Sequence, residues 1–414
     1  MGETVHLIGA ARTDFKRNFR KEGNGLRDAI TEVARAAIAR AGVEPQDISA
    51  GVVGNFAGGL FTRQLHLGAF LTEVDERLRG LPTWHVEAAC ASGGVAVLNA
   101  AQQIMGGLRD VVLVVGAEQQ KTMSPADGAD VLGAAGDFAV EKAQFGDFMF
   151  PKLFGRMAQL YAERHGLTDR QLALAAFKNH AHARLNPLAQ MRDSTLALDQ
   201  FCTESEANPR IAPPLKSTDC SQITDGAAAA VLCSGRFAAK LARPPRVRLL
   251  GFGHTTDHLS LASKDVPDLP IPRRAAEQAY AMANLTPSAL HAAEVHDCFS
   301  ISEIVAYEIL GFADPGQGTA LLESGATALP PVREQFRAPH SALRIQNLPV
   351  NTSGGLMGDG HPVGATGVRQ VVTAFQQLTD TAGAFQVPAA RRVLTFNMGG
   401  SFTTSVVMIW GADE

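Results

Sequence analysis

Short apolar runs alternate with helical patterns over the first 120 residues of the chain. Apolar runs at 5–10, 48–54, 85–89 and 111–116 predict four buried strands. After the first of them, apolar positions recur at helical spacing from Leu26 to Ala41, and Gly42 and Pro45 end that helix. A helix of small residues is predicted over 90–105. This order predicts an alternating α/β fold with a mostly parallel sheet.

The pattern changes between residues 121 and 217. Residues 145–150 are aromatic and turn-rich, 153–165 and 169–184 have helical patterns, and no strand pattern stands out. We therefore expect an inserted, largely helical lobe. Residues 223–233 return to a strand pattern, and a joint rich in Pro and Arg at 242–246 marks a domain boundary.

The second half of the chain repeats the order of the first. Strand patterns at 247–252, 293–295 and 393–397 alternate with helical patterns at 275–283 and 354–378, the last of which opens on a glycine-rich turn. Two copies of one α/β unit account for this order. The predicted organisation is a first half at 1–120, a loop lobe over the site at 121–217, a return to the first half at 218–245 and a second half at 246–414.

Composition and charge narrow the function classes. The 37 basic and 41 acidic side chains give a formal charge of −4 without a Lys/Arg-rich stretch, which argues against nucleic acid as a partner. No apolar run approaches the roughly 20 residues needed to cross a bilayer, so no membrane partner is expected. The five cysteines, Cys90, Cys202, Cys220, Cys233 and Cys298, are scattered and form no Cys-x-x-Cys pair. They are typical of reduced thiols in a cytoplasmic enzyme, not of zinc ligands.

Cys90 lies where a predicted strand turns into a helix, within Glu-Ala-Ala-Cys-Ala-Ser-Gly-Gly at 87–94. A thiol at a helix N-terminus faces unpaired N–H groups and the positive end of the helix dipole, which lowers its pKa from about 8.5 toward neutrality. A lone cysteine is more often a buried structural residue. The setting of Cys90 favours a nucleophile instead.

A second candidate segment surrounds His361. Residues 351–355 read Asn-Thr-Ser-Gly-Gly, and residues 358–367 read Gly-Asp-Gly-His-Pro-Val-Gly-Ala-Thr-Gly. A histidine in this setting could take a proton from a thiol or hold a developing oxyanion. The alternative is a phosphate-binding glycine loop, but the segment has neither a Walker lysine nor the Gly-x-Gly-x-x-Gly spacing.

A third candidate is the sequence His-Asp-Cys-Phe at 296–299, between a short predicted strand and a helix predicted over 302–310. It places the imidazole of His296 and the thiol of Cys298 at the C-terminal edge of the sheet, where α/β proteins build their sites. Together with Cys90 and His361, these residues supply a nucleophile, a base and a second acid.

These elements together resemble a thiolase. The likeness rests on Ala-Cys-Ala-Ser-Gly around Cys90, on His-Asp-Cys-Phe and on Gly-His-Pro-Val-Gly-Ala-Thr-Gly at 360–367. It covers essentially the whole chain, with Lys-Asn-His at 178–180 and Asp-Gly-Ala-Ala at 225–228 in the expected order. The His-Asp-Cys-Phe element is similar to the sterol-carrier-protein type of thiolase. The resemblance implies a five-layered α/β/α/β/α fold of two similar halves with an inserted helical loop lobe.

The resemblance also implies the catalytic roles. Cys90 would accept the acyl group as a thioester, and His361 would activate it by removing its proton. Most thiolases carry a second catalytic cysteine in a Cys-x-Gly motif, but residues 397–399 of this chain read Asn-Met-Gly. Cys298 would therefore be the acid/base at the α-carbon of the substrate.

Two oxyanion holes follow from the same resemblance. His296 and His361 would hold the enolate of the CoA thioester, and the backbone N–H groups of Cys90 and Gly399 would hold the tetrahedral intermediate. Phe148, Met149 and Phe150 either pack in the core or line an acyl pocket. Ser353 and Gly354 are further candidates for substrate contact, and Arg210 and Lys216 for the CoA phosphates.

The expected function is acyl-CoA C-acyltransfer, which makes or cleaves a C–C bond at a CoA thioester by ping-pong transfer through Cys90. CoA is a substrate here, so neither a metal nor an organic cofactor is expected, and thiolases are typically homodimers or homotetramers. Two alternatives stay open. Relatives of this type include steroid side-chain aldolases and C-acyltransferases that need a small OB-fold and zinc-ribbon partner protein. A non-catalytic protein that binds lipid or acyl-CoA would explain the missing Cys-x-Gly cysteine.

Overall fold

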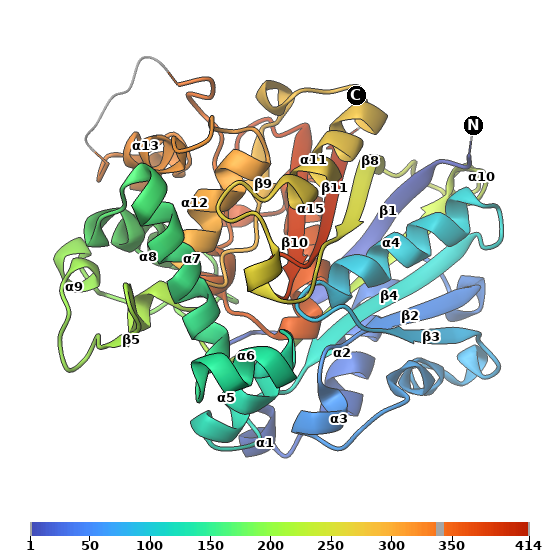
Figure 1. Cartoon of the computed structure of the whole chain (residues 1–414). Coiled ribbons are helices and arrows are strands. Elements are labelled where there is room, and N and C mark those ends of the chain that lie inside the picture. Colours follow the sequence, from blue (N-terminus) through green and yellow to red (C-terminus); the bar gives the residue numbers. More distant parts are fainter. Residues whose placement is uncertain (1, 337–342, 413–414) are drawn as a thin grey trace.

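The computed structural model describes residues 2–336 and 343–412 and contains one large, strongly twisted sheet (Figure 1). Its strands are β1 (Val5–Arg12), β2 (Ala50–Gly54), β3 (Thr83–Val86), β4 (Val111–Glu118), β7 (Gly226–Ser234), β8 (Val247–Thr256), β9 (Ala292–Glu294), β10 (Arg392–Gly399) and β11 (Thr404–Ala412). They are paired in the order β3-β2-β4-β7-β1-β8-β11-β10-β9. The first half of the chain therefore forms one side of the sheet, and the second half forms the other.

Four helices give the fold its layers. They are α2 (Leu26–Ala41), α4 (Ser92–Met105), α11 (Pro270–Ala283) and α15 (Thr366–Leu378). α4 and α15 pack on each other between the two parts of the sheet, α2 covers β1, β4 and β7 from outside, and α11 covers β8 and β11 (Figure 1). The small residues of α4 let it lie buried between two sheet faces. The five-layered α/β/α/β/α fold is confirmed.

The two halves have the same order of elements. The first runs β1-α2-β2-α4-β4-β7, and the second runs β8-α11-β9-α15-β10-β11. In the first half, β3 pairs in parallel with β2. At the corresponding place in the second half, Val350 forms an isolated parallel bridge with Ala293 of β9. The repeat that the sequence indicates is thus present in three dimensions.

The expectation of a mostly parallel sheet is wrong. Among the described strands of this sheet, β2–β3, β2–β4 and β9–β10 are the parallel pairs, whereas β1–β7, β4–β7, β1–β8, β8–β11 and β10–β11 are antiparallel. β11, which the sequence patterns did not predict, follows β10 after a turn of four residues at 400–403. So short a turn allows only antiparallel pairing.

The segment between β4 and β7 is largely helical and forms the lobe drawn in green in Figure 1. It contains α5 (Pro125–Gly133), α6 (Phe138–Phe145), α7 (Met149–His165), α8 (Asp169–Ala183) and α9 (Leu198–Cys202). An unpredicted small hairpin, β5 (Arg210–Ala212) with β6 (Leu215–Lys216), completes it. α8 packs on α12 (Ser300–Ile309), which begins just after the His-Asp-Cys-Phe element. The shorter helices are α1 (Phe19–Glu22), α3 (Gly58–Phe61), α10 (Gly235–Ala238), α13 (Gly318–Glu323) and α14 (Pro330–Arg333).

All five cysteines are free thiols. Across residues 2–336 and 343–412, no helix is long and apolar enough to cross a membrane.

Candidate active site

Cys90 lies in a tight turn between β3 and α4. Ala89 has a left-handed backbone with φ of 50°, and Ser92 holds the turn together. The hydroxyl of Ser92 accepts the N–H of Ala88 at 2.9 Å and donates to the carbonyl of Ala89 at 2.6 Å. Cys90 is therefore fixed just before the helix, as the sequence predicts, with 3% of its surface exposed.

The predicted effect on the Cys90 thiol is wrong in sign. Burial raises the pKa of Cys90 to about 12, although hydrogen bonds from the backbone N–H groups of Gly400 and Cys90 itself act to lower it. At this depth of burial, the cost of desolvating a thiolate outweighs the effect of the helix terminus on the pKa. Cys90 is thus a neutral thiol at rest.

His361 follows a one-turn π-helix at Gly355–Asp359 and precedes α15. Its Nδ1 lies 2.7 Å from the hydroxyl of Thr366, which donates in turn to the carbonyl of Pro362 at 3.1 Å. Burial, and then the positive charge of Arg369, lower the pKa of His361 to about 3. His361 is therefore a neutral imidazole, and its remaining nitrogen, Nε2, is free for the site.

His296 lies just beyond β9 with no exposed surface. Its Nδ1 is 3.1 Å from the amide nitrogen of Asn397, while its Nε2 has no hydrogen-bond partner among the described residues. The rings of His296 and His361 stand nearly perpendicular, with centroids 5.1 Å apart. Burial, then His361 and Arg369, lower the pKa of His296 well below its usual range.

Cys298 reaches the same site two residues after His296. Its sulfur lies 3.8 Å from the hydroxyl of Ser302. Burial, followed by the nearby thiol of Cys90, raises its pKa well above the usual range. The following residue, Phe299, stacks on Phe154 with ring centroids 4.4 Å apart. The structure thus brings both thiols and both histidines of the sequence prediction together.

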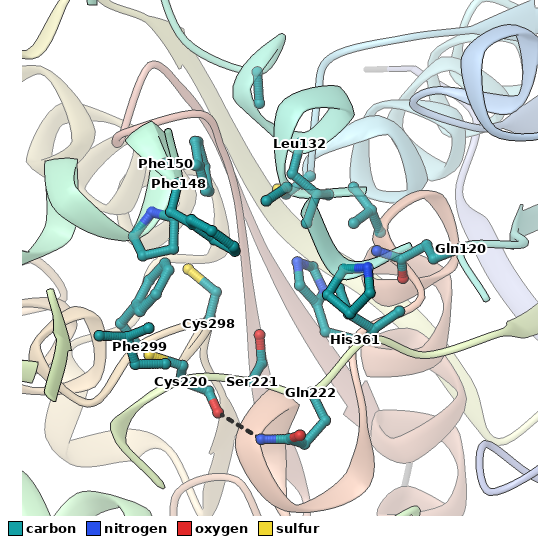
Figure 2. A pocket seen from close by; sticks show the side chains of 18 residues that line it. Gln120, Leu132, Phe148, Phe150, Cys220, Ser221, Gln222, Cys298, Phe299 and His361 are labelled. Atoms are coloured by element: carbon teal, nitrogen blue, oxygen red, sulfur yellow. Dashed lines mark hydrogen bonds between the residues drawn. The ribbon is translucent and has the colours of Figure 1, made fainter. Parts of the chain in front are cut away.

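Cys90, Cys298 and His361 line a cavity of about 200 Å³ that opens between the helical lobe and the sheet, whereas His296 is not among its lining residues. Figure 2 shows Cys298 beside Phe148, Phe150 and Phe299, with His361 on the opposite side. The lining also includes Cys90 and is otherwise mainly apolar. Phe148 and Phe150 therefore line the cavity, as one of the two sequence interpretations has it.

One sulfur and two nitrogens, from Cys90, His296 and His361, lie within 4.8 Å of one another. A thiolate and two imidazoles are also a common donor set for zinc. Each imidazole would have to offer a lone pair at the free nitrogen, so the position of the ring protons decides whether the cluster suits a cation or an oxyanion.

The turn after β10 closes the site behind Cys90. Two backbone N–H groups hydrogen-bond the thiol of Cys90: its own and that of Gly400. Gly400 lies one residue after Gly399, which the sequence interpretation named. A Cβ on Gly399 would lie 2.2 Å from the carbonyl oxygen of Ala88, so only glycine allows this close approach. Lys264 holds the turn with hydrogen bonds to the carbonyl and hydroxyl of Ser401 (2.6 and 2.9 Å) and to the hydroxyl of Thr403 (2.7 Å).

Two buried carboxylates hold the catalytic loops. Asp297 accepts the N–H groups of Leu356 (2.7 Å) and Met357 (3.2 Å), and so ties the His-Asp-Cys-Phe element to the segment before His361. Burial, then Glu303, raise the pKa of Asp297 to about 7. Glu118 accepts the N–H of Gly364 at 3.0 Å, and burial raises its pKa to about 7 as well.

Several predicted contact residues lie away from the cavity. Met149 is buried in α7. The hydroxyl of Ser353 donates to Glu294 at 2.9 Å, and Gly354 packs against Ala183, so both belong to the buried support of the His361 loop.

The two candidate cations for CoA are already paired. Lys216 has no exposed surface and bonds to Asp219 at 2.9 Å. Arg210 pairs with Asp169 and with Glu204. Neither is a free positive charge at the surface, so the structure gives no support to a role for them at the CoA phosphates.

Sequence reasoning missed three supporting residues: Asn397, Thr366 and Glu118. Asn397 and Glu118 both stand near the ends of apolar strands, and polar residues at that edge of a sheet are a signal that could have found them. Thr366 lies five positions after His361 at the start of α15, which is a weaker signal.

Comparisons with known proteins agree with this geometry. The family models "Thiolase, N-terminal domain" and "Thiolase C-terminal domain-like" match residues 5–236 and 253–412. Acetyl-CoA acetyltransferase of Methanothermobacter thermautotrophicus is 35% identical over 98% of this chain and 99% of its own length. Benzoylsuccinyl-CoA thiolase subunit BbsB of Thauera aromatica is 30% identical over 96% of this chain and 94% of its own. Sterol carrier protein 2 of Bos taurus is 30% identical over 95% of this chain and 70% of its own length. Among solved structures, the Ltp2-ChsH2(DUF35) aldolase matches with a TM-score of 0.79 at 23% identity, over 99% of this chain and 98% of that one.

Proposed function

Because this chain belongs to the thiolase family, we propose that it is an acyl-CoA C-acyltransferase that cleaves or makes a C–C bond through an acyl-Cys90 intermediate. One observation carries the proposal. The sulfur of Cys90 meets one nitrogen each of His296 and His361 within 4.8 Å, beside an apolar cavity that also exposes Cys298. A nucleophile, a base and a second thiol are thus available to one substrate.

In the cleavage direction, the sulfur of Cys90 attacks the β-keto carbon of a 3-ketoacyl-CoA as its proton passes to Nε2 of His361. The bond between the α- and β-carbons breaks, and the α-carbon takes the proton of Cys298. Acetyl-CoA leaves, and Cys90 holds the shortened acyl group. Since Cys90 and His361 are both neutral at rest, with pKa values of about 12 and about 3, proton transfer accompanies the attack and does not precede it.

In the second half-reaction, the thiol of CoA attacks the thioester on Cys90 and its proton goes to the thiolate of Cys298. Cys90 leaves as a thiolate and takes back the proton held by His361, so every group returns to its starting state. Condensation is the reverse sequence. Cys298 begins cleavage as a thiol, which agrees with its raised pKa.

Two sets of donors stabilise the charges that form. The unpartnered Nε2 of His296 and the protonated Nε2 of His361 would donate to the enolate oxygen of the departing thioester. The backbone N–H groups of Cys90 and Gly400, which hydrogen-bond the resting thiol, would hold the oxygen of the tetrahedral intermediate. Loss of one such donor typically reduces kcat about 10²- to 10³-fold.

The cavity points to the acyl group that Cys90 carries. Phe148, Phe150, Phe299 and Leu132 line it, and burying an apolar chain against such side chains contributes about 25 cal/mol per Å². We therefore propose uncharged, apolar acyl groups as substrates. CoA enters as a substrate, and none of these steps uses a metal or an organic cofactor.

The test is to mix the purified protein with acetoacetyl-CoA, with and without CoA, and follow substrate loss and intact mass. An acetyl adduct with CoA-dependent turnover is the expected result, and Cys90→Ala should form no adduct. A covalent acyl group that persists in Cys90→Ala would overturn the assignment of the nucleophile. If acetoacetyl-CoA gives no adduct, longer 3-ketoacyl-CoA substrates are the next probes, since the cavity suits them.

A second candidate is an enzyme of the same fold that works only with a partner protein. Two names support it: the Thauera aromatica relative is called a subunit, and the aldolase of similar fold is named together with a DUF35 protein. Co-purification with a small OB-fold and zinc-ribbon protein, and activity only in its presence, would favour this candidate. A non-catalytic acyl-CoA-binding protein is less well supported, because both thiols and both histidines converge.

We also propose a homodimer or homotetramer that assembles through the edge of the sheet at β3. β3 is the end strand of the described sheet, and its Trp84 is 40% exposed. An unpaired edge strand with an exposed aromatic side chain is suited to pairing with a second copy. Light scattering after gel filtration measures the state, and Trp84→Lys should favour the monomer.

We place the enzyme in the cytoplasm. Its five free thiols, two of them assigned to catalysis, fit a reducing compartment. Cell fractionation followed by immunoblotting tests the placement.

A further inference from the structure

Asn397 stands at the end of β10, at the position where most thiolases would have a second cysteine. Its side chain is buried, with 2% of the residue exposed. Its Oδ1 accepts the N–H of Gly94 at 2.9 Å, and its Nδ2 lies 3.0 Å from the carbonyl oxygen of Cys90 and 3.1 Å from Nδ1 of His296. One amide thus connects the nucleophile helix to an oxyanion-hole histidine.

The orientation of this amide is fixed by its two backbone partners. The N–H of Gly94 can only donate, and the carbonyl of Cys90 can only accept. A flipped amide would set donor against donor at Gly94 and acceptor against acceptor at Cys90, so the NH₂ group must lie on the side of Cys90 and His296. Its two hydrogens match two acceptors, the carbonyl oxygen of Cys90 and Nδ1 of His296.

The proton of His296 is placed by this arrangement. Because Nδ1 accepts a hydrogen bond, the single proton of the neutral ring must be on Nε2. The lowered pKa of His296 agrees with a neutral ring. Nε2 is buried and has no partner among the described side chains and backbone groups, so its N–H is a hydrogen-bond donor that the resting protein leaves unused.

His361 is held in the opposite tautomer. The hydroxyl of Thr366 is 3.1 Å from the carbonyl of Pro362, which can only accept, and 2.7 Å from Nδ1 of His361. With the hydroxyl hydrogen on the carbonyl, Nδ1 of His361 donates to Thr366. Nε2 of His361 then carries a lone pair, as a base for Cys90 requires. Two neighbouring imidazoles in one site therefore present a donor and an acceptor.

We propose that Asn397 is a positioning residue that locks His296 in the Nε2–H tautomer, so that this nitrogen donates to the thioester oxygen and cannot bind a metal ion. The proposal rests on the proposed function for the donor role, but the tautomer itself does not. It also explains why a cluster of one thiol and two imidazoles within 4.8 Å of one another suits an oxyanion. A zinc-type ion needs a lone pair on each ligand, and Nε2 of His296 has none.

The first test measures the tautomers in the resting wild-type protein and needs no variant. The protein is labelled with ¹⁵N-histidine, and two-bond ¹H–¹⁵N spectra are recorded near neutral pH, with His296→Gln and His361→Asn used to assign the two rings. We expect a protonated Nε2 and a bare Nδ1 for His296, and the reverse for His361. A His296 ring protonated on Nδ1 would overturn the proposal, even if the enzyme turns over acetoacetyl-CoA.

The second test removes the hydrogen bond from Asn397 to Nδ1 of His296 with Asn397→Ala and uses Co²⁺ as the probe. Freed from the amide, His296 can place its proton on Nδ1 and offer Nε2 to a metal. We expect Asn397→Ala to gain a thiolate-to-cobalt absorption band that Cys90→Ala removes, while the wild type shows none at the same Co²⁺ concentration. Equal cobalt binding by the wild type, or an unchanged His296 tautomer in a folded Asn397→Ala, would contradict the proposal.

Kinetics separate this proposal from the proposed function. Asn397→Ala should lower kcat for acetoacetyl-CoA cleavage about 10²-fold, as expected for loss of one oxyanion donor, with a much smaller change in KM. A wild type that never forms acyl-Cys90 would refute the thiolase function but leave the tautomer measurement standing. An active wild type with unchanged kcat in Asn397→Ala would refute only the positioning role.

Discussion

Removal of the thiol of Cys298 should leave acetyl transfer to Cys90 nearly unchanged and should slow cleavage of the C–C bond. Transfer of an acetyl group between acetyl-CoA and Cys90 leaves the protons of the α-carbon in place, so Cys298 keeps its own proton throughout. The proton that His361 takes from Cys90 passes to the departing CoA thiolate, and this exchange therefore needs only Cys90 and His361. Cleavage of acetoacetyl-CoA needs a proton at the α-carbon, which Cys298 supplies. Cys298→Ala should therefore exchange acetyl-CoA with labelled CoA at nearly the wild-type rate, but cleave acetoacetyl-CoA slowly.

The expected magnitude follows from the surroundings of the sulfur. Its contact with the hydroxyl of Ser302 is a weak one at 3.8 Å, so the loss of the side chain should cost little stability. A positioned acid or base typically contributes 10²- to 10⁴-fold to a rate, which is about 3–5 kcal/mol of the barrier at about 1.4 kcal/mol per tenfold. Cleavage should slow by that factor, and exchange by less than about threefold.

Two assays on the same preparation check this result. Isotope exchange between acetyl-CoA and labelled CoA measures acylation alone, and loss of acetoacetyl-CoA absorbance measures the complete reaction. Cys233→Ala is the matched control, since Cys233 lies in β7 on the first-half side of the sheet, away from the cavity. Equal slowing of exchange and cleavage in Cys298→Ala would show that Cys298 only shapes the site and is not the acid/base.

Two further predictions concern residues that hold the site. Gly399→Ala should slow acylation of Cys90 about 10²-fold, the typical cost of a misplacement of about 1 Å at a reacting group, since its Cβ would lie 2.2 Å from the carbonyl oxygen of Ala88 and push the turn away. Gly128→Ala, whose Cβ would approach nothing closer than 3.9 Å, should acylate normally. Intact mass measures acylation of both variants, and rapid acylation of Gly399→Ala would argue against a close-packed turn. The pKa of Glu118 is raised from 4.5 to about 7, so between these values the folded protein keeps a proton that the unfolded chain has lost, and the contribution of this group to stability falls by about 3 kcal/mol as pH rises. Glu118→Gln should remove that part of the pH dependence of the urea midpoint, and a pH profile parallel to that of the wild type would contradict the assignment.

Local pattern was sufficient for most elements of the large sheet, though not for β11 or the β5–β6 hairpin, and it singled out the two thiols and two histidines that the structure brings together. The predicted strands at 5–10 and 111–116 and the helix from Leu26 to Ala41 agree with β1, β4 and α2. The predicted direction of strand pairing was wrong. β7 pairs with β4 after an insertion of more than a hundred residues, and no local sequence signal determines that pairing.

The electrostatics of the site could not be predicted from local pattern either. The helix start at Cys90 indicates a lowered pKa, but the turn at Gly399 and Gly400, some 300 residues away, helps to close the site around the sulfur, and burial raises the pKa instead. At Asn397 the sequence indicates only a missing cysteine. The hydrogen bonds that give the amide its importance come from Gly94, Cys90 and His296, which only the tertiary structure brings together.

The two similar halves depend on each other in a reciprocal way. Asn397, near the end of β10 in the second half, bonds to Cys90 and Gly94 at the nucleophile of the first half. Glu118, at the end of the corresponding strand β4 in the first half, bonds to Gly364 in the loop of the base in the second half. Each half thus supplies a residue at a strand end that holds the reactive group of the other half. Neither half can complete its own site, so two separately expressed halves should be inactive until they reassociate.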